Sequence, residues 1–250
     1  MGMRLAGKRA VVTGGAQGFG AGIVRRFVAE GGRVLIADLQ GDAARALADE
    51  LGPQADALAV DVSSDDSVAA MARTLGGLWG GVDILVNNAG IGHTPQPLDA
   101  LDPAQFDRIL AVNVRSIYLT ARHLVPMMKA QRSGAILNVA STAAVSPRPN
   151  LTWYNASKGF VVTATRSMAV ELAPFKIRVN ALNPVAGETP LLKTFMGAET
   201  PEVRAKFLST IPLGRFSTPE DMGNAALFLC SEEASMVTGV CMEVDGGRCI

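Results

Sequence analysis

A serine, a tyrosine and a lysine in the second half of the chain have the types and the spacing of an acid–base site. Tyr154 lies thirteen residues after Ser141, and Lys158 follows four residues later. If residues 153–172 form a helix, Tyr154 and Lys158 share one helical face. An adjacent ammonium group lowers the pKa of a phenol, and such a phenol can exchange a proton between an alcohol and a carbonyl. A serine hydroxyl nearby can position the reacting oxygen.

A tyrosine and a lysine four residues apart are also typical of an ordinary surface pair, so the chemistry depends on the elements that position them. Short runs rich in Val, Ile and Leu alternate with longer helical patterns, which is typical of a parallel sheet covered by helices on both faces. We expect one α/β domain over residues 1–250, with a doubly wound parallel sheet and a substrate lid inserted at about 187–211. The expected strands are 9–13, 33–37, 55–60, 82–86, 134–139, 177–182 and 240–244.

Glycines follow the first expected strand, in the run Thr13-Gly14-Gly15-Ala16-Gln17-Gly18-Phe19-Gly20. Glycines allow a sharp turn and a close approach of the backbone to a pyrophosphate, and the following helix N-terminus offers free N–H groups. A plain tight turn would also explain glycines at this place. The order of strand, glycines and helix favours a dinucleotide site.

An acidic residue, Asp38, closes the second expected strand. A carboxylate at this position can accept hydrogen bonds from a ribose diol and repel a 2′-phosphate. The neighbouring Leu39, Gln40 and Gln17 are uncharged, so no basic side chain is present to receive that phosphate. The sequence therefore favours NAD over NADP, although a solvated acid at a strand end is the simpler alternative.

Two later strand ends fit the same site. Asp61 and Val62 could flank an adenine ring, while a helix N-cap acid ahead of Ser63 and Ser64 is the alternative. The run Asn87-Asn88-Ala89-Gly90 follows the fourth strand, where small residues would let the backbone pass near a ligand. A purely structural turn would also explain this run.

Composition excludes several other classes of protein. The 250 residues carry 23 basic and 23 acidic side chains, and a net charge of zero argues against nucleic acid or an anionic membrane as partner. Two histidines and three unclustered cysteines do not suit a zinc dehydrogenase, so we expect no metal. The G-x-S-x-G motif of a serine hydrolase is absent. No apolar run reaches membrane-spanning length, and we expect a cytoplasmic protein.

Taken together, these motifs resemble the short-chain dehydrogenase/reductase family in its compact form. The matching positions are Thr13-Gly-x-x-x-Gly18-x-Gly20, Asn87-Asn-Ala-Gly90, Asn113, Ser141, Tyr154-x-x-x-Lys158 and Asp245-Gly246-Gly247. The resemblance covers almost the whole chain and implies a Rossmann-type sheet and a homotetramer. It implies that Tyr154 gives or takes the proton, that Lys158 lowers the tyrosine pKa and holds the nicotinamide ribose, and that Ser141 orients the substrate. Asn113 would support a water that connects Lys158 to a proton relay.

The resemblance also implies a set of cofactor-binding residues. They are Gly14, Gln17, Gly18, Phe19, Gly20, Asp38, Leu39, Asp61, Val62, Asn87, Ala89, Gly90, Tyr154, Lys158, Pro184, Val185 and Thr189. One departure concerns the run after the sixth strand, where the family usually has Pro-Gly. Val185 replaces that glycine, and if the glycine was needed for a positive φ, valine forces another backbone path.

The expected lid predicts a mostly apolar substrate pocket. Its side chains would be Thr189, Leu191, Leu192, Phe195 and Met196, with Val145, Trp153 and Val185 adding apolar surface. We expect Arg148 and His93 to be loop residues that face water, although either could receive a carboxylate or phosphate. The expected substrate is a small or medium secondary alcohol, including cyclic ones, and its ketone.

Two alternative functions stay open. A 3-oxoacyl-[acyl-carrier-protein] reductase is the first, but that activity usually goes with NADP, which Asp38 disfavours, and no basic patch for a carrier is evident. A non-catalytic dinucleotide sensor is the second. A sensor would be expected to lose Ser141, Tyr154 or Lys158, and all three are present.

Overall fold

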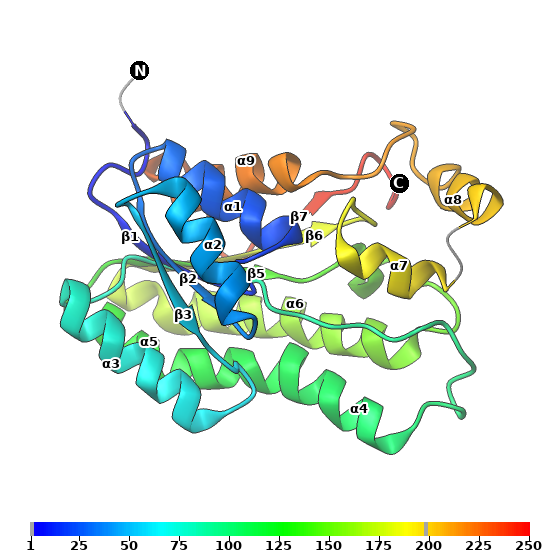
Figure 1. Cartoon of the computed structure of the whole chain (residues 1–250), viewed down its shortest axis with the longest axis horizontal. Coiled ribbons are helices and arrows are strands. Elements are labelled where there is room, and N and C mark those ends of the chain that lie inside the picture. Colours follow the sequence, from blue (N-terminus) through cyan, green and yellow to red (C-terminus); the bar gives the residue numbers. More distant parts are fainter. Residues whose placement is uncertain (1–2, 198–199) are drawn as a thin grey trace.

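A computed structural model describes residues 3–197 and 200–250. Its centre is a seven-stranded parallel sheet with the order β3-β2-β1-β4-β5-β6-β7 (Figure 1). The chain winds outward from β1 in one direction and, after a crossover to β4, in the other, which confirms the doubly wound sheet expected from the sequence. The strands are β1 (Arg9–Thr13), β2 (Arg33–Asp38), β3 (Ala55–Ala59), β4 (Ile84–Asn87), β5 (Gly134–Val139), β6 (Ile177–Pro184) and β7 (Cys241–Val244).

The sheet is buried on both faces because its strands are apolar at successive positions. Val12 and Ile36 point into one core, while Val11 and Leu35 point into a second core on the opposite face. Successive side chains of a strand alternate between faces, so a continuous apolar run supplies both cores. This is why runs rich in Val, Ile and Leu, without strict alternation, form the centre of the molecule.

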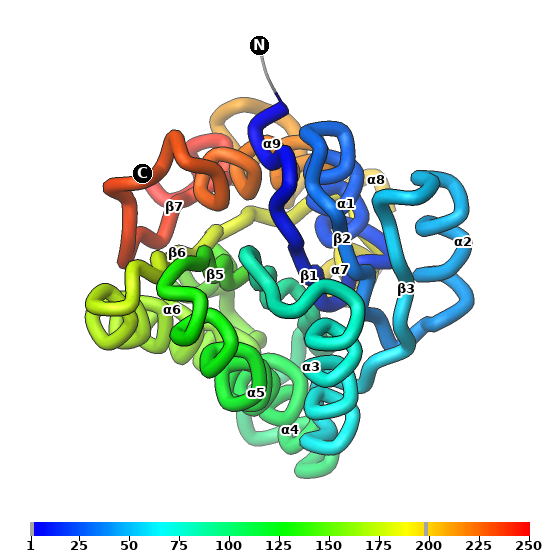
Figure 2. Tube along the Cα trace, turned by 90° about the vertical axis from the view of Figure 1, so that its left-hand side faces the viewer, coloured from blue at the N-terminus to red at the C-terminus, as the bar shows by residue number. Residues whose placement is uncertain are grey.

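Two groups of helices cover the sheet. One face is covered by α1 (Gly18–Ala29), α2 (Gly41–Leu51) and α9 (Pro219–Cys230), whose buried side chains join the first core. The other is covered by α3 (Asp65–Trp79), α5 (Ser116–Gln131) and α6 (Thr152–Leu172), which supply the second core. The two views agree on this three-layer arrangement (Figures 1 and 2). Helix α4 (Pro103–Leu110) continues into α5 through a π-helical turn, Ala111–Arg115.

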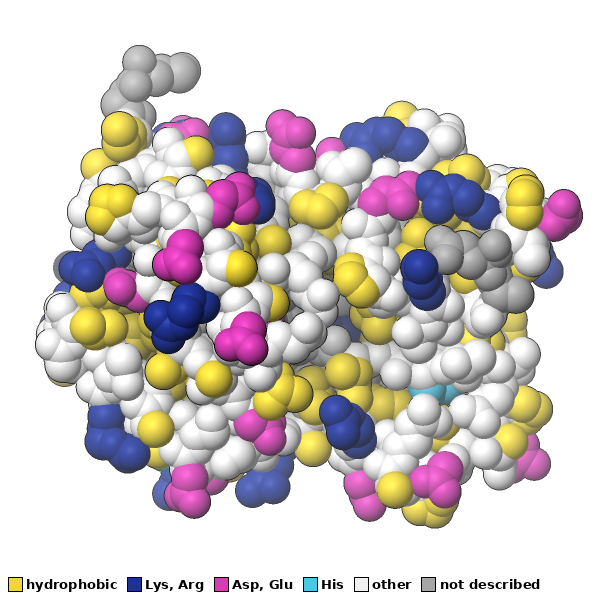
Figure 3. Space-filling view, viewed as in Figure 1, with side chains coloured by type: hydrophobic (Ala, Val, Ile, Leu, Met, Phe, Trp, Pro, Cys, Tyr) yellow, Lys and Arg dark blue, Asp and Glu magenta, His cyan; other side chains and the backbone are white. Residues whose placement is uncertain are grey.

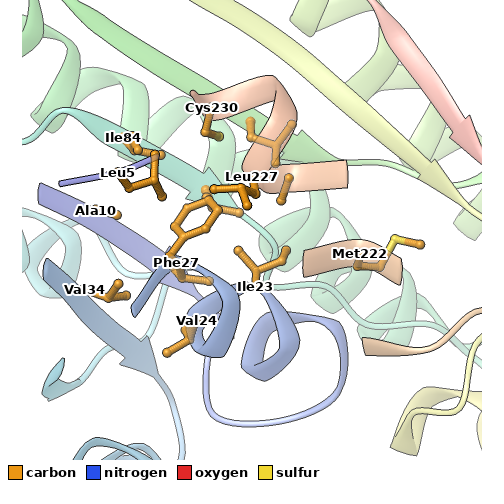
Figure 4. Packing of buried hydrophobic residues seen from close by; sticks show 14 of the residues in the cluster. Leu5, Ala10, Ile23, Val24, Phe27, Val34, Ile84, Met222, Leu227 and Cys230 are labelled. Atoms are coloured by element: carbon orange, nitrogen blue, oxygen red, sulfur yellow. The ribbon is translucent and has the colours of Figure 1, made fainter. Parts of the chain in front are cut away.

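Helices α1 and α9 approach closely because glycine lies where they cross. A Cβ atom added at Gly22 would lie 2.1 Å from the carbonyl oxygen of Pro219, and one added at Gly223 would lie 2.7 Å from the carbonyl oxygen of Gly22. Around this contact Phe27, fully buried, packs with Ile23 and Leu227 (Figure 4). The pair of helices therefore depends on the absence of side chains at two positions.

The expected interruption at 187–211 contains two short helices, α7 (Pro190–Met196) and α8 (Pro201–Leu208). They lie beside the carboxyl ends of the strands, at the right of Figure 1. Three buried side chains of this region, Leu192, Met196 and Ile211, form a small apolar cluster with Val185 and Phe216 that is separate from the two cores. Within the described part of the chain, no helix is long and apolar enough to cross a membrane.

Candidate active site

One cavity of about 340 Å³ lies at the carboxyl ends of the strands. In Figure 3 this face of the molecule is hollowed near its middle. Segments that follow six strands line the cavity, as expected for a ligand site at the edge of a parallel sheet. These segments contribute Gly14, Asp38–Gln40, Val60–Val62, Asn88–Ile91, Val139–Ala143 and Pro184–Gly187.

The glycine turn after β1 forms one end of the cavity. Gly14 and Gly18 adopt positive φ angles of 60° and 54°, and a Cβ atom at Gly14 would lie 2.9 Å from Cα of Ala89. Helix α1 begins at Gly18 without a side-chain cap at Gln17 and without an acidic residue in its first turn. Its first N–H groups and its positive dipole end are therefore available to an anion.

Gly20 has a different role, because it does not line the cavity. A Cβ atom there would lie 2.0 Å from the carbonyl oxygen of Gly14, so glycine allows α1 to start directly against the turn. Phe19 lines the cavity, and Gly187 is glycine because a Cβ there would lie 2.2 Å from the Phe19 ring.

Asp38 lies at the same end and is held in one orientation. Its carboxylate accepts hydrogen bonds from the backbone N–H groups of Ala16, at 3.0 Å, and Gln40, at 2.9 Å. Only 7% of the residue is exposed, yet it lines the cavity together with Leu39 and Gln40. The acid is therefore a fixed part of the cavity wall rather than a solvated strand end.

Asp61 and Val62 also line the cavity. Asp61 accepts hydrogen bonds from the backbone N–H and the hydroxyl of Ser63, while Ser64 is the N-cap of α3. The N-cap alternative for Asp61 is thus wrong, because the neighbouring serine takes that place.

The two asparagines after β4 differ in position. The Asn88 amide donates to the carbonyl oxygens of Thr13, at 3.0 Å, and Gly14, at 2.8 Å, and so holds the glycine turn from the side of the cavity. Asn88 was part of the motif found in the sequence but not of the expected cofactor-binding residues. Asn87 was expected at the cofactor, but its amide donates to Asn138 and accepts from Thr120 inside the protein. Asn87 does not line the cavity.

Ser141, Tyr154 and Lys158 meet at the other end of the cavity. The Ser141 side chain forms a hydrogen bond with Tyr154. The Lys158 Nζ donates to the Val139 carbonyl oxygen at 2.9 Å and lies 6.0 Å from the centre of the Tyr154 ring. Three residues that are far apart in sequence therefore face one space.

The pKa of Tyr154 differs from the expectation. Burial raises it from 10.0 to about 12, and only the hydrogen bond with Ser141 acts in the opposite direction. Burial also lowers the pKa of Lys158 from 10.5 to about 8. The lowered tyrosine pKa expected from the sequence is thus wrong, because desolvation by burial is the largest effect on the Tyr154 hydroxyl.

Asn113 lies in the π-helical turn beside these residues and is buried. Its amide oxygen accepts from the Ile91 N–H at 2.9 Å, and its amide nitrogen donates to the Ile91 carbonyl and to the Ser157 hydroxyl. These bonds join the π-helical turn, α6 and the loop after β4. The water-supporting role implied by the resemblance stays a prediction.

The segment after β6 closes the cavity. Pro184, Val185 and Thr189 line it, and Val185 is not among the described residues with positive φ. Valine therefore fits the backbone here without strain, with its N–H donating to the Val244 carbonyl at 3.3 Å. Thr189 packs against the glycine turn, since a Cβ at Gly18 would lie 3.2 Å from the Thr189 side chain.

Only some of the side chains expected in the substrate pocket line this end of the cavity. Leu191, Leu192 and Phe195 line the cavity, and the Phe195 ring lies 4.8 Å from the Tyr154 ring. Val145, Trp153 and Met196, by contrast, do not line it. Val145 is exposed, Trp153 donates its indole N–H to the Leu98 carbonyl at 2.8 Å, and Met196 packs into the lid's own cluster.

The two charged or titratable candidates are less exposed than expected. His93 is 2% exposed, its Nδ1 lies 2.9 Å from the Thr94 carbonyl oxygen, and its Nε2 has no hydrogen-bond partner. Arg148 is half-buried and lines the cavity. The water-facing expectation is wrong for His93, which lies in the loop that Phe195 of α7 contacts at Gly92, and it holds only in part for Arg148, which is covered by Phe207 of α8. No group of three or more potential metal ligands occurs among the residues described.

The buried lysine predicts a pH-dependent stability of the protein without cofactor. Between about pH 8 and 10.5 the unfolded chain binds a proton at Lys158 that the folded chain does not bind, so the free energy of unfolding should rise with pH in this window. From pH 8 to pH 10 the free energy of unfolding of wild type should rise by about 2 kcal/mol more than that of Lys158→Met, which has no ammonium group at this position. Urea unfolding of both proteins at the two pH values measures this gain, and parallel behaviour would contradict it.

Comparison with known proteins identifies the class. The family signature described as "Enoyl-(Acyl carrier protein) reductase" matches residues 14–248. The chain is 46% identical to 4-formylbenzenesulfonate dehydrogenase of Comamonas testosteroni over 98% of this chain and 99% of that protein. It is 40% identical to 7alpha-hydroxysteroid dehydrogenase of Escherichia coli, over 98% and 95% of the two chains.

A solved structure gives the same result. The 3-ketoacyl-(acyl-carrier-protein) reductase of Brucella melitensis, complexed with NADH, superposes with a TM-score of 0.94 at 51% identity, covering 98% of this chain and 99% of that one. The chain belongs to the short-chain dehydrogenase/reductase family, as the motifs predicted. It is therefore an oxidoreductase, and the NADH in the Brucella structure supports the expectation of NAD over NADP.

Proposed function

We propose that the protein uses NAD(H) to interconvert a small or medium secondary alcohol, including cyclic ones, and its ketone. One observation carries this proposal: Ser141, Tyr154 and Lys158 face the same cavity whose other end holds the glycine turn and Asp38. The sensor alternative does not explain why a complete acid–base group lines that cavity.

The residues at the nucleotide end fit a dinucleotide. The turn has no Cβ atoms at Gly14 and Gly18, the start of α1 has no side-chain cap, and the fixed Asp38 carboxylate can accept from a ribose diol. When bound, the nicotinamide ring supplies or accepts the hydride. The residues proposed to bind the dinucleotide are the predicted ones that line the cavity: Gly14, Gln17, Gly18, Phe19, Asp38, Leu39, Asp61, Val62, Ala89, Gly90, Tyr154, Lys158, Pro184, Val185 and Thr189.

The chain's own residues handle the proton. With its pKa near 12, Tyr154 carries its proton at neutral pH and can give it to a carbonyl oxygen during reduction. Oxidation needs the reverse transfer onto a phenolate, which an ammonium group at Lys158 stabilises. The Ser141 hydroxyl donates to the same substrate oxygen and holds it in reach of Tyr154.

The relatives support a cyclic substrate and keep one alternative. The names of the Comamonas and Escherichia coli relatives denote ring compounds, and the apolar side chains Leu151, Leu192 and Phe195 suit a ring. The name of the Brucella neighbour instead supports a 3-oxoacyl thioester as second candidate.

Consumption of NADH over a panel of cyclic ketones and one 3-oxoacyl thioester tests the proposal. We expect turnover of at least one ring ketone, with a kcat/KM above that for the thioester. A higher value for the thioester would favour the second candidate. Tight NADH binding with no turnover across the panel would favour a sensor.

Asp38 predicts the cofactor preference. We expect NADH to raise the melting temperature of wild type more than NADPH does, because the buried carboxylate repels a 2′-phosphate. Asp38→Ala should reduce this preference by about tenfold or more, since it removes a charged hydrogen-bond acceptor. Thermal shift titrations with both cofactors measure it, and Asp42→Ala, in the first turn of α2, is a control. Stronger stabilisation of wild type by NADPH would contradict the prediction.

We also propose that the protein forms a homotetramer. Apolar side chains are exposed on two of the helices that cover the second core: Tyr118 on α5, and Phe160 and Val170 on α6. Covering them between subunits would remove apolar surface from water. Sedimentation velocity should give a species of four times the chain mass of 26.1 kDa. A monomer at all concentrations would contradict this expectation.

A further inference from the structure

Arg148 brings a positive charge to the substrate end of the cavity. It lies in the loop between Ser141 and Tyr154, and its backbone carbonyl accepts from the Asn155 amide at 2.9 Å, which fixes the loop to α6. Its guanidinium lies 4.3 Å from the Phe207 ring centre and donates to the Thr210 hydroxyl at 3.1 Å. A guanidinium has five N–H donors, so these contacts leave most of its donors and all of its charge without an acidic partner.

A second guanidinium increases this positive charge. Arg248 donates to the Ser146 hydroxyl at 2.7 Å, two residues before Arg148, and its Nε is buried without a partner. Arg248 and burial together lower the pKa of Arg148. Asp245 is the acidic residue nearest to Arg248 in sequence, but its carboxylate oxygens accept hydrogen bonds from the backbone N–H groups of Gly247 and Cys249. No ion pair to Arg148 or Arg248 is found among the described residues.

The one arginine within the expected lid, Arg204, is paired, which sets Arg148 apart. Arg204 on α8 also stacks on a phenylalanine, at 4.7 Å from the Phe216 ring centre, but it forms an ion pair with Glu188. A half-buried charge is normally paired, because leaving water is costly for an ion. Arg148 therefore has the surroundings of a group whose partner arrives with the substrate.

We propose that the substrate carries an anionic group, a carboxylate or a sulfonate, at the end opposite its reacting carbon, and that Arg148 binds this group. This inference rests on the proposed function and narrows its substrate class. The hydroxyl or carbonyl lies at Tyr154 and Ser141, the apolar body contacts Leu151 and Leu192, and the anion meets the guanidinium of Arg148. Arginine suits this role because its planar fork matches a two-oxygen anion.

Binding of simple ring compounds to the NAD-loaded protein tests this inference. Calorimetry would compare benzoate and benzenesulfonate with benzamide, which has the same ring but no charge. We expect wild type to bind at least one of the two anions about tenfold to a hundredfold more tightly than benzamide. Arg148→Met should remove this preference, and Arg148→Lys should keep part of it because the charge remains.

Two variants separate charge from fold. Arg204→Met removes a stacked arginine that has its own acidic partner, and Thr210→Val removes the hydrogen bond of Arg148 without its charge; both should keep the anion preference. Equal affinities for anions and benzamide in wild type, no anion binding, or a preference that survives Arg148→Met would overturn the inference. Failure of the protein to bind NAD in the loading step would instead count against the proposed function.

Discussion

Tyr154→Phe should lower kcat by about 10²- to 10⁴-fold, the usual contribution of a positioned acid–base group. The substitution removes one hydroxyl and keeps the ring that packs against Phe195. Tyr154 is buried beside Ser141, and the described cavity offers no second phenol to replace it. Affinity for NADH should stay within about twofold of wild type, because Asp38 and the glycine turn are untouched.

The chain contains the matched control for this experiment. Its only other tyrosine, Tyr118, is exposed on α5 and accepts a hydrogen bond from Arg122 at 3.2 Å. Tyr118→Phe should leave kcat unchanged. Steady-state rates with saturating NADH, together with fluorescence titration of NADH binding, measure both effects. A near-normal rate for Tyr154→Phe would exclude Tyr154 as the acid–base group.

Gly22→Ala should destabilise the protein strongly, by about 3 kcal/mol, because overpacking forces the backbone to move. The added methyl carbon would lie 2.1 Å from the Pro219 carbonyl oxygen. That oxygen belongs to the backbone, so no flexible side chain can rotate to relieve the contact. Helices α1 and α9 must then separate, which opens the core around Phe27. Urea unfolding with the slope held common to both proteins measures the loss.

Alanine at Gly77 should have the opposite effect and raise the free energy of unfolding. Gly77 lies in α3, where a Cβ atom meets nothing within 4 Å. Alanine there gains about 0.5–1 kcal/mol, because it restricts the unfolded chain and favours the helix. A destabilised Gly77→Ala, or a neutral Gly22→Ala, would show that local space does not decide the effect of alanine at these glycines.

The sheet could be predicted almost completely from the sequence. The continuous apolar runs specify strands that are buried on both faces, and β1 was predicted with its observed bounds, Arg9–Thr13. Errors concern ends: β4 begins at Ile84 rather than at residue 82, and β6 continues to Pro184 rather than ending at 182. Val82 is apolar and fully buried before the strand begins, so hydrophobicity alone could not place that boundary.

Type and order were enough to select Ser141, Tyr154 and Lys158, which line one cavity, whereas the environments of the candidate residues were not predictable. Asn87 and Asn88 are identical in type, and only the pleat of β4 sends the first into the protein and the second to the cavity wall. The tyrosine pKa depends on how completely α7 covers Tyr154, which no local pattern contains. Helix α7 also contacts the loop of the buried His93, and Phe207 of α8 packs against Arg148, so long-range packing decides these environments.

The separate apolar cluster of α7 and α8 has a consequence for how ligands enter. Because Leu192, Met196 and Ile211 belong to this separate cluster, we expect the lid predicted from the sequence to open locally while both main cores stay intact. Such local opening requires less free energy than global unfolding. Amide hydrogens of the lid should therefore exchange sooner than those of β1 or β5. We expect such opening to let ligands enter and leave while the sheet stays folded, and to expose Tyr154, which is buried in the structure described.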